Sequence, residues 1–547
     1  MARNIAQVLQ ELSDCKADER FCTSIASGNA RSISYSELYR RSCAYAHYYR
    51  SVGIRPGDIV LVILRHSPHQ FYSYLGAILA GAIPSFMPFP SPKQRSELYW
   101  ADHAALFARI EPRLIVTYPE NAGSARESAA ASSIAICIAE DSILDRFAGD
   151  DTDFAGFDAR LDDIACLQHS SGTTGLKKGV MLTHRMLLDH HAAYAQTIGF
   201  TDADSIVSWL PLYHDMGFIA CFMGSLLSGT HLVALDPFEW VLRPRILFDA
   251  IEKFRTTFCW LPNFAFSHMV NAVRGSATWD LASMRAYINC SEPCKITTFD
   301  RFVDRFRDSG VSAEKLAVSY AMAENVFAVT QTPIGIPSTV RVAETASGTI
   351  EQRHLSCGFA VPGVDLRIFD SNTHVQLPDG EVGEIYIASP FLFGGYYRLP
   401  EKSRERLVDG WYATGDMGYL SEGQLYVTGR LDDMLIINGR NYYAHEMEAL
   451  MADIPEIIPG RSVAIGIDEE RSDATVMVIL AECRDEAADV GHQVKRIVLE
   501  RTGLALHAFI PVERGMLVKT TSGKLSRAKN KELYLRGQFE PRKFSGP

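Results

Sequence analysis

The sequence contains no long uninterrupted run of apolar residues. Its most apolar stretch, residues 74–87, is broken by glycines and by Pro84, well short of the about 20 apolar residues that a membrane-spanning helix needs. The first residues also lack the basic and apolar pattern of a secretory signal. We therefore expect a protein that has no membrane span and resides in the cytoplasm.

Paired cysteines and an excess of positive charge are lacking as well. The 11 cysteines are scattered singly, and the one close pair, Cys290 and Cys294, lacks the second pair that a zinc site needs. Reduced thiols and no zinc are therefore expected. The formal net charge of −11 at pH 7 argues against a general affinity for nucleic acid or for an anionic membrane. Neither is expected as a partner.

What the sequence does contain is material for a large core. Of its 547 residues 47% are apolar, and a chain of this length usually forms more than one domain. Amphipathic helical segments alternate with short runs rich in β-branched residues, and this alternation predicts a layered α/β fold. Helices are predicted at residues 36–51, 69–79 and 243–254, and buried strands at 59–64, 204–209, 231–235 and 257–261.

The pattern changes near residue 365. Short strands separated by turn clusters there predict a β-rich subdomain at about residues 360–430. A small α+β unit is predicted to follow. We therefore expect a large domain of residues 1–430 and a small domain of residues 431–547, hinged at Asp432. The predicted strands are 365–369, 383–388, 424–428, 462–467 and 475–481, and helices are predicted to begin at His445 and Asp489.

Residues 168–180 are rich in glycine and hydroxyl groups and lie between two apolar segments. Such a loop suits a phosphate group, because glycines let backbone N–H groups approach an anion, hydroxyls add donors and a lysine adds positive charge. The spacing differs from that of a Walker loop. A solvated surface loop is the alternative interpretation. The candidate phosphate-binding residues are Ser170, Ser171, Gly172, Thr173, Thr174, Gly175 and Lys178.

This segment resembles the phosphate-binding signature of the adenylate-forming superfamily, which comprises acyl-CoA synthetases, nonribosomal peptide adenylation domains and luciferases. Further motifs of that superfamily follow in order, and the resemblance covers essentially the whole chain. The sequence resembles the aromatic and histidine motif at residues 208–217, the adenine and magnesium motif at 320–324, the ribose motif at 412–416, the hinge at 429–433 and the catalytic-lysine motif at 520–524.

The resemblance implies roles for individual residues, and each role has a plainer alternative. Asp416 is implied to accept hydrogen bonds from both ribose hydroxyls, where the alternative is a turn cap. Glu324 is implied to be catalytic and to bind Mg²⁺, which prefers hard oxygen ligands, where the alternative is a solvated carboxylate. Lys524 is implied to be catalytic, where the alternative is one more exposed cation in a basic tail.

Other positions of the nucleotide and acid sites follow from the same resemblance. Arg430 is implied to contact the ribose, and pairing with Asp432 or Asp433 is its alternative. His214 is implied to be a catalytic residue beside the acyl group. The remaining residues implied to bind the nucleotide are Ser291, Glu292, Pro293, Tyr320 and Ala321.

These roles imply a ligase that uses ATP and Mg²⁺. The carboxylate of an organic acid attacks the α-phosphorus of ATP, and cations and oriented donors offset the charge that builds up on the leaving pyrophosphate. A thiol then attacks the acyl-adenylate and AMP leaves. Because Lys524 must approach for the first step and would crowd the thiol in the second, a rotation of the small domain about Asp432 is implied.

The acid is expected to be hydrophobic, and a fatty acid in the first place. His214 is followed by Asp215 in the Leu-Pro-Leu-Tyr-His-Asp-Met-Gly pattern of fatty acyl-AMP ligases. Soon after the histidine motif, the sequence lacks the short Phe-Asp pattern with which peptide-forming domains bind an amino group. Nearby aromatic residues predict an apolar pocket, although such residues belong more often to the core. They are Trp209, Phe218, Phe222, Phe264 and Phe266.

Three features favour an acyl carrier protein over free CoA as the acceptor. Ala323 replaces the usual threonine of the magnesium motif, and residues 289–293 and 438–443 resemble elements of the fatty acyl-AMP ligase branch. The interval from Glu324 to Cys357 argues the other way, because it is short for the insertion that blocks CoA in that branch. An acyl-CoA or aryl-CoA ligase therefore stays an alternative.

A protein that binds adenylate without catalysis is a further alternative, although such a protein would have no need of Lys524. Two positions depart from the superfamily pattern. Lys177 stands where the phosphate loop usually has proline, and Val518 stands where proline is common. These departures affect the expected rate and leave the expected reaction unchanged.

Overall fold

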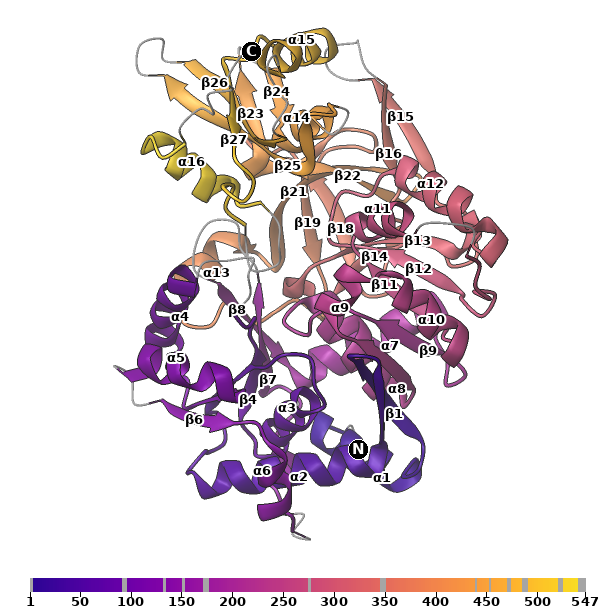
Figure 1. The fold of residues 1–547 in the computed structure, drawn as a ribbon, viewed down its shortest axis with the longest axis vertical. Helices are drawn as coiled ribbons and strands as arrows, with labels where there is room; N and C mark the ends of the chain where they lie inside the picture. Colours follow the sequence, from indigo (N-terminus) through magenta and orange to yellow (C-terminus); the bar gives the residue numbers. More distant parts are fainter. Residues whose placement is uncertain are drawn as a thin grey trace.

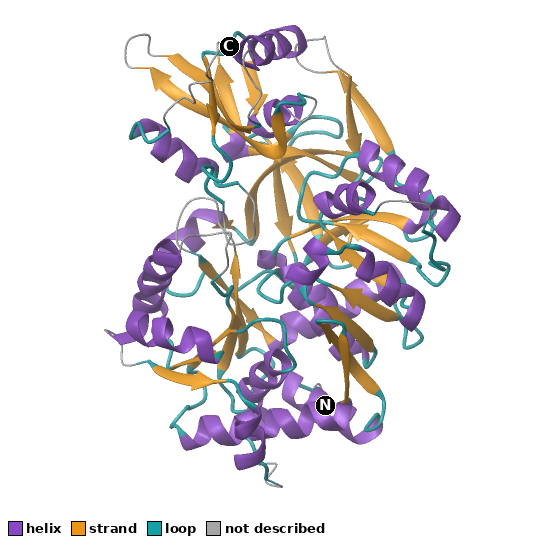
Figure 2. Cartoon of the chain, viewed as in Figure 1, coloured by secondary structure: helices purple, strands orange, loops and turns teal. Residues whose placement is uncertain are grey.

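The protein is described by a computed structural model. It describes residues 3–90, 96–130, 134–149, 153–170, 177–273, 277–344, 351–437, 440–451, 454–469, 474–484, 490–519 and 525–539. Figure 1 shows the N-terminal elements in the lower part of the view and the C-terminal elements at the top, and Figure 2 shows helices and strands mixed throughout. Within these ranges no helix has the length and apolar character needed to cross a bilayer. The predicted layered α/β class is confirmed.

The first 150 residues supply a helix-covered sheet. Its elements are α1 (Ile5–Cys15), α2 (Tyr35–Ser51), β3 (Ile59–Ile63), α3 (His69–Leu79), β4 (Ile83–Phe86), α4 (Ser96–Ile110), β5 (Leu114–Thr117), α5 (Pro119–Ala129), β6 (Ala135–Ile138) and α6 (Asp141–Arg146). The strands are parallel in the order β4-β3-β5-β6. Every residue of β3 is buried, as expected of a strand that is covered on both faces. The predicted elements α2, β3 and α3 are confirmed.

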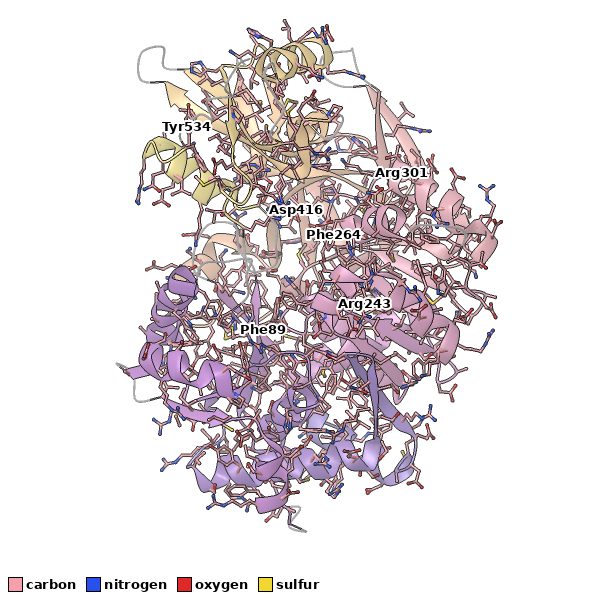
Figure 3. The ribbon with its side chains drawn as sticks, viewed as in Figure 1. Phe89, Arg243, Phe264, Arg301, Asp416 and Tyr534 are labelled. Atoms are coloured by element: carbon pink, nitrogen blue, oxygen red, sulfur yellow. The ribbon has the colours of Figure 1, made fainter. Side chains whose placement is uncertain are left out.

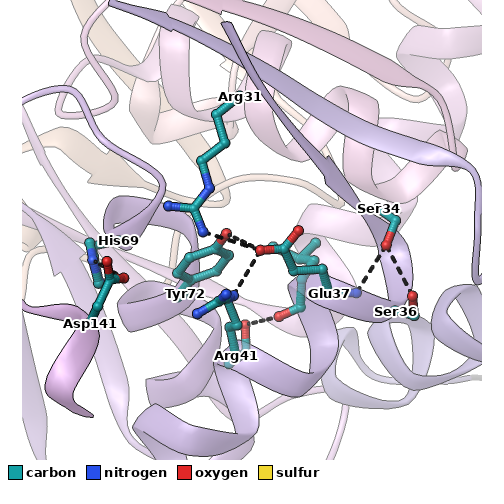
Figure 4. Close-up of polar contacts among 10 residues, drawn as sticks. Arg31, Ser34, Ser36, Glu37, Arg41, His69, Tyr72 and Asp141 are labelled. Carbon is teal, nitrogen blue, oxygen red and sulfur yellow. Dashed lines mark hydrogen bonds and ion pairs between the residues drawn. The ribbon is translucent and has the colours of Figure 1, made fainter. Parts of the chain in front are cut away.

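Polar contacts hold α2 against its neighbours (Figure 4). Ser34 Oγ accepts a hydrogen bond from the backbone N–H of Glu37 at 3.1 Å and so caps the helix. Glu37 Oε1 accepts from Arg41 Nε at 2.7 Å and from Arg31 Nη2 at 3.3 Å. The same oxygen accepts from the hydroxyl of Tyr72 on α3 at 3.4 Å. One carboxylate therefore ties α2 to α3.

A second sheet of nine strands forms the centre of the fold. Its strands are β1 (Arg20–Ala26), β2 (Asn29–Ser34), β9 (Ser205–Ser208), β10 (His231–Leu235), β11 (Phe258–Leu261), β12 (Ala286–Asn289), β13 (Leu316–Ala321), β14 (Ala328–Gln331) and β17 (Phe359–Ala360). The order is β17-β14-β13-β12-β11-β9-β10-β1-β2. The strands from β13 to β1 in this order are parallel. Ligands of such sheets bind beyond the carboxyl ends of the strands.

Helices and one hairpin surround this sheet. The hairpin is β7 (Ile164–Ser170) with β8 (Lys178–Thr183), and the helices are α7 (His184–Ile198), the π-helix Met216–Met223, α8 (Gly224–Ser228), α9 (Pro237–Leu242), α10 (Arg245–Phe254), α11 (Asn263–Ala272) and α12 (Ile296–Phe306). The predicted strands β9, β10 and β11 and the predicted helix α10 are confirmed to within two residues. The candidate phosphate loop joins β7 to β8, as the sequence predicts.

A third, antiparallel sheet follows residue 360. Its strands are β18 (Asp365–Phe369), β19 (Gly383–Ala388), β20 (Leu407–Val408), β21 (Trp411–Ser421) and β22 (Gln424–Arg430), and α13 (Pro400–Arg406) lies between β19 and β20. The order is β18-β19-β21-β20, with β22 also paired to β21. Before it, β15 (Val340–Glu344) and β16 (Glu351–Leu355) form a hairpin. The predicted β-rich region is confirmed.

The last described residues form a small α+β arrangement. Its elements are β23 (Met434–Ile437), β24 (Arg440–Tyr443), α14 (Ala444–Leu450), β25 (Ile457–Glu469), β26 (Ala474–Cys483), α15 (Val490–Thr502), β27 (Ala508–Val512) and α16 (Arg527–Leu535). The strands pair in the order β25-β26-β27. Its apolar side chains form two clusters that contain only residues from Ile437 to Phe539. This part of the chain therefore has a core of its own.

Candidate active site

Three of the predicted motifs meet at Asp416, a buried residue of β21 that Figure 3 labels in the middle of the molecule. Its Oδ2 accepts a hydrogen bond from the hydroxyl of Tyr320 at 2.7 Å, and its Oδ1 accepts one from Arg430 Nε at 3.0 Å. Strand pairing explains the second contact, because Asp416 and Arg430 are partners in the pair β21–β22. Arg430 thus pairs with Asp416, whereas the alternative interpretation predicts an ion pair with Asp432 or Asp433.

The protonation states of Tyr320 and Arg430 follow from their surroundings. Burial, followed by the Asp416 carboxylate, raises the pKa of Tyr320, so that the tyrosine hydroxyl stays a donor at neutral pH. The same carboxylate raises the pKa of Arg430. Each carboxylate oxygen accepts more than one hydrogen bond. Asp416 therefore keeps acceptor capacity for further hydroxyl donors.

The second carboxylate, Glu324, lies in the turn between β13 and β14. Its Oε1 accepts a hydrogen bond from the hydroxyl of Tyr396 at 2.8 Å. Lys178 Nζ lies 4.8 Å from the centroid of the Tyr396 ring. Because Lys178 is the first residue of β8, the structure brings the end of the candidate phosphate loop to within one side chain of Glu324. Glu324 is half-buried and hydrogen-bonded, so it is not a freely solvated carboxylate.

Sequence reasoning missed Tyr396. Its only signal is the cluster Gly394-Gly395-Tyr396-Tyr397 between β19 and α13. Gly395 has a φ of 113°, a conformation that only glycine adopts readily, and its carbonyl accepts from the backbone N–H of Met181 on β8 at 3.2 Å. This glycine therefore aims Tyr396 at Glu324.

Two residues in or beside the predicted nucleotide-binding segments have a left-handed backbone, which is unusual outside glycine. They are Ser291, with a φ of 69°, and Val326, with a φ of 63°. The conformation is strained for a β-branched residue such as Val326, and strain of this kind gathers at functional sites. Ser291 lies in the predicted adenine segment after β12, together with Glu292 and Pro293. Glu292 Oε2 accepts from the backbone N–H of Phe264 at 3.0 Å and anchors this segment to α11.

His214 lies between β9 and the π-helix. Its backbone N–H donates to the Pro211 carbonyl at 3.2 Å, and its own carbonyl accepts from Phe218 N at 2.8 Å. Gly217 makes this packing possible, because a Cβ there would lie 2.5 Å from the Pro211 carbonyl oxygen. Asp215 Oδ1 accepts from Met216 N at 2.8 Å and caps the π-helix. The His214 to Gly217 motif is therefore a rigid joint between a strand and a helix.

An apolar cavity adjoins the π-helix that follows this joint, between α7, α8 and the sheet. Three of its lining residues come from three different segments of the fold. Ile219 comes from the π-helix that follows His214, Phe327 from the turn that carries Glu324, and Trp260 from β11. A cavity with these walls suits an apolar chain.

The aromatic residues expected at the pocket do not line this cavity. Phe218 and Phe222 pack against Tyr74 and Phe71 of α3, and Phe266 packs against Phe299 of α12. Trp209 stacks on Trp240 with ring centroids 3.7 Å apart, and Phe264 is exposed. The plainer interpretation, that aromatic residues near a motif belong to the core, holds for most of them.

Several predicted residues lie outside the described residues. They are Ser171, Gly172, Thr173, Thr174 and Gly175 of the phosphate loop and the catalytic candidate Lys524, and the side chain of Ser170 is likewise not described. Leu525, which follows Lys524, is described, and it forms an antiparallel bridge with Lys519. Asp432 lies in the Leu431–Asp433 turn between β22 and β23. Ala321 ends β13, one residue after Tyr320.

Comparison with known families identifies the family of the chain. Residues 13–397 match the family described as "AMP-binding enzyme". The chain belongs to this family. Its match spans the hairpin β7–β8, the His214 joint and the turn of Glu324, so the resemblance on which the interpretation of the sequence rested is confirmed.

Individual relatives of this AMP-binding enzyme are similar over most of their length. The long-chain-fatty-acid–AMP ligase FadD26 of Mycobacterium bovis is 28% identical over 583 residues, which cover 98% of both chains. The medium-chain-fatty-acid–[acyl-carrier-protein] ligase JamA of Moorena producens is 27% identical over 414 residues, or 70% of each chain. A structure from studies of fatty acyl-adenylate ligases of E. coli and L. pneumophila has a TM-score of 0.87 at 24% identity over 98% of both chains, which shows a shared fold.

Proposed function

We propose that this AMP-binding enzyme activates a hydrophobic carboxylic acid, a fatty acid in the first place, with ATP. The products of the first step are acyl-AMP and pyrophosphate. In the second step the acyl group passes to the phosphopantetheine thiol of an acyl carrier protein, and AMP leaves. FadD26 and JamA, two relatives that act on fatty acids according to their names, support this proposal.

One observation carries the choice of acid. The apolar cavity shares its walls with the segments that hold the two functional residues His214 and Glu324, because Ile219 and Phe327 line it. A chain that enters the cavity therefore packs against the segments that carry His214 and Glu324. No cation lines the cavity, whose only ionisable side chains are His190, His191 and Tyr194.

The residues of this chain divide the first step between them. Asp416 and Arg430 orient the ribose, and Tyr320 holds Asp416 in place. Lys178 and the loop before it offset the charge of the phosphates. Fixing both reactants in this way removes much of the entropic barrier to attack on the α-phosphorus.

The donor set also suits Mg²⁺. This ion is bound in nucleotide sites through one or two carboxylates together with phosphates, and Glu324 is a carboxylate held in place by Tyr396. Glu324 is therefore the residue that would hold the ion. When bound, Mg²⁺ supplies neutralisation of the negative charge that develops on the leaving pyrophosphate.

The second step requires the catalytic lysine to move away. We propose that residues 431–547 form a small domain that carries Lys524 and turns about Asp432 relative to residues 1–430. The separate apolar clusters after Ile437 support this division. A unit with its own core can turn on a short hinge without exposing that core.

The acceptor is tested by competition. Pyrophosphate release is first screened with acids of varied chain length, with Lys524→Ala as the inactive control. Acyl-adenylate formed on the enzyme is then offered CoA and a holo carrier protein at equal concentration. We expect the carrier thioester as the major product. Acyl-CoA as the major product would assign the protein to the acyl-CoA ligases. The short interval from Glu324 to Cys357 is the sequence feature that favours this alternative.

A further inference from the structure

An ion pair joins two helices from opposite ends of the chain. Lys529 Nζ of α16 lies 3.1 Å from Asp102 Oδ2 of α4. Figure 1 shows these helices one above the other at the left edge of the molecule. Helix α16 begins at Arg527, three residues after Lys524. The contact therefore connects the segment that follows the catalytic lysine with the large domain.

The same helix α4 holds the end of the candidate phosphate loop. Arg109, in its last turn, donates from Nη2 to the backbone carbonyl of Lys177. The side chain of Lys177 is close enough to Asp102 for the carboxylate to act on its pKa, which burial lowers to about 8. Asp102 thus faces one lysine from the phosphate loop and one lysine from α16.

A third contact extends this arrangement to Glu324. The backbone carbonyl of Arg109 accepts from Arg398 Nη1 at 3.1 Å, and Arg398 also pairs with Glu111 at 2.7 Å. Arg398 lies two residues after Tyr396, the residue that holds Glu324. One end of α4 is therefore tied to the phosphate loop and to the segment of Tyr396, while Asp102 reaches α16.

Helix α16 is anchored at a second point, on the hinge side. Arg527 pairs with Asp433, next to the hinge residue Asp432, and with Glu448 of α14 at 2.8 Å. Arg527 fixes α16 within its own domain, and Lys529 links the same helix to the large domain.

We propose that Asp102 is a positioning residue for adenylate formation. By pairing with Lys529, it holds the start of α16, which follows Lys524 in the chain, against the helix that also holds the end of the phosphate loop. This inference rests on the proposed function and concerns its first step only. Transfer to the thiol requires Lys524 to withdraw, so the pair must break before that step.

The rates of adenylate formation and of acyl transfer, measured separately, test this role of Asp102. In Asp102→Asn and in Lys529→Met, adenylate formation should slow by about 2- to 5-fold, the range for a partly exposed ion pair. The rate of acyl transfer from chemically supplied acyl-AMP to the thiol should stay unchanged or increase. High salt should slow the wild type more than either variant. Lys529→Arg, which keeps the positive charge opposite Asp102, should retain most of the wild-type rate. Asp162→Asn breaks the exposed pair with Arg185 at 2.7 Å and serves as the matched control without effect.

The outcomes separate this inference from the proposed function. Wild-type rates of adenylate formation in both single variants would overturn the inference, and so would an equal slowing of both steps. A Lys529→Arg variant as slow as Lys529→Met, in a protein that melts like the wild type, would also overturn it. If none of the hydrophobic acids tested makes the wild type release pyrophosphate, the proposed function itself is wrong, whatever the variants show.

Discussion

The two carboxylates of the site are positioned by the same chemical device. Asp416 accepts a hydrogen bond from the hydroxyl of Tyr320, and Glu324 accepts one from the hydroxyl of Tyr396. Burial raises the pKa of both tyrosines, so each hydroxyl remains a donor to its carboxylate at neutral pH. The carboxylates are thereby held in place for donors or cations that arrive with the nucleotide.

Asp416→Ala should weaken ATP binding by about 1–3 kcal/mol, because ribose hydroxyls lose their shared acceptor. The effect should be smaller for 2′-deoxy-ATP, which lacks one of those hydroxyls. Nucleotide affinities of the folded variant, measured by calorimetry, check this. Equal losses for both nucleotides would mean that Asp416 acts only on the structure, through Arg430 and Tyr320.

Tyr396→Phe should raise the Mg²⁺ concentration needed for half-maximal adenylate formation by about 10-fold, because it removes a hydrogen bond to a charged group. The neighbouring half-buried Tyr397 supplies the matched control Tyr397→Phe, for which we expect wild-type behaviour. A titration of the rate with Mg²⁺ measures both. An unchanged Mg²⁺ dependence in Tyr396→Phe would separate Glu324 from the metal.

At the scale of elements, the segment from the π-helix to α8 shapes the acid site. A π-helix is wider than an α-helix and is often found at functional positions. Here it joins the His214 motif to the wall of the apolar cavity, where Gly224 begins α8. A Cβ on Gly224 would lie 3.5 Å from the Ile219 carbonyl oxygen and 3.6 Å from Ile206, which are ordinary contacts. A larger side chain would have to enter the cavity.

Gly224→Leu should shift the preference of the enzyme toward shorter acids. For long acids kcat/KM should fall by about 10-fold or more, which is the discrimination that one or two methylene groups produce in an apolar pocket. Gly224→Ala should behave nearly like the wild type. Ala192→Leu adds the same bulk on the exposed side of α7 and serves as the control. A chain-length profile of Gly224→Leu that matches the wild type would exclude this cavity as the acyl site.

At the scale of the whole molecule, buried neutral histidines link stability to pH. Burial lowers the pKa of His103 and of His169 to about 3, and that of His190 to about 4. In the unfolded chain a histidine has a pKa of about 6.5. As the pH falls below that value, the unfolded state takes up protons that the folded state does not. Stability is therefore complete above about pH 6.5 and is lost as the pH falls toward 4.

The free energy of unfolding should be lower at pH 5.5 than at pH 7.5, by about 1 kcal/mol for each of these histidines. Denaturant unfolding at the two pH values measures the difference. His190→Gln keeps a donor for the Ala328 carbonyl, which His190 Nε2 contacts at 3.1 Å, and should lose less stability on acidification. Equal stability of the wild type at both pH values would contradict the burial of neutral histidines.

Much of the fold was predictable from local patterns, because burial periodicity and turn chemistry are properties of neighbouring residues. The strand β3 is an unbroken apolar run, and the loop between β7 and β8 contains glycines that are visible in the sequence. The partners of side chains were less accessible. Arg430 had two acidic neighbours in sequence, yet it pairs with Asp416, because an antiparallel register places those two residues side by side.

The sequence by itself determined the order of the motifs, the chemical type of each functional residue and the alternation of helices and strands, since all of these depend on short spacings. Only the tertiary structure decided that Tyr396 meets Glu324, that the aromatic residues after His214 face α3, and that Asp102 meets a lysine 427 residues away. The physical reason is that apolar burial has no preferred direction. Which segments share a core, and which polar groups thereby become neighbours, depends on the packing of the whole chain.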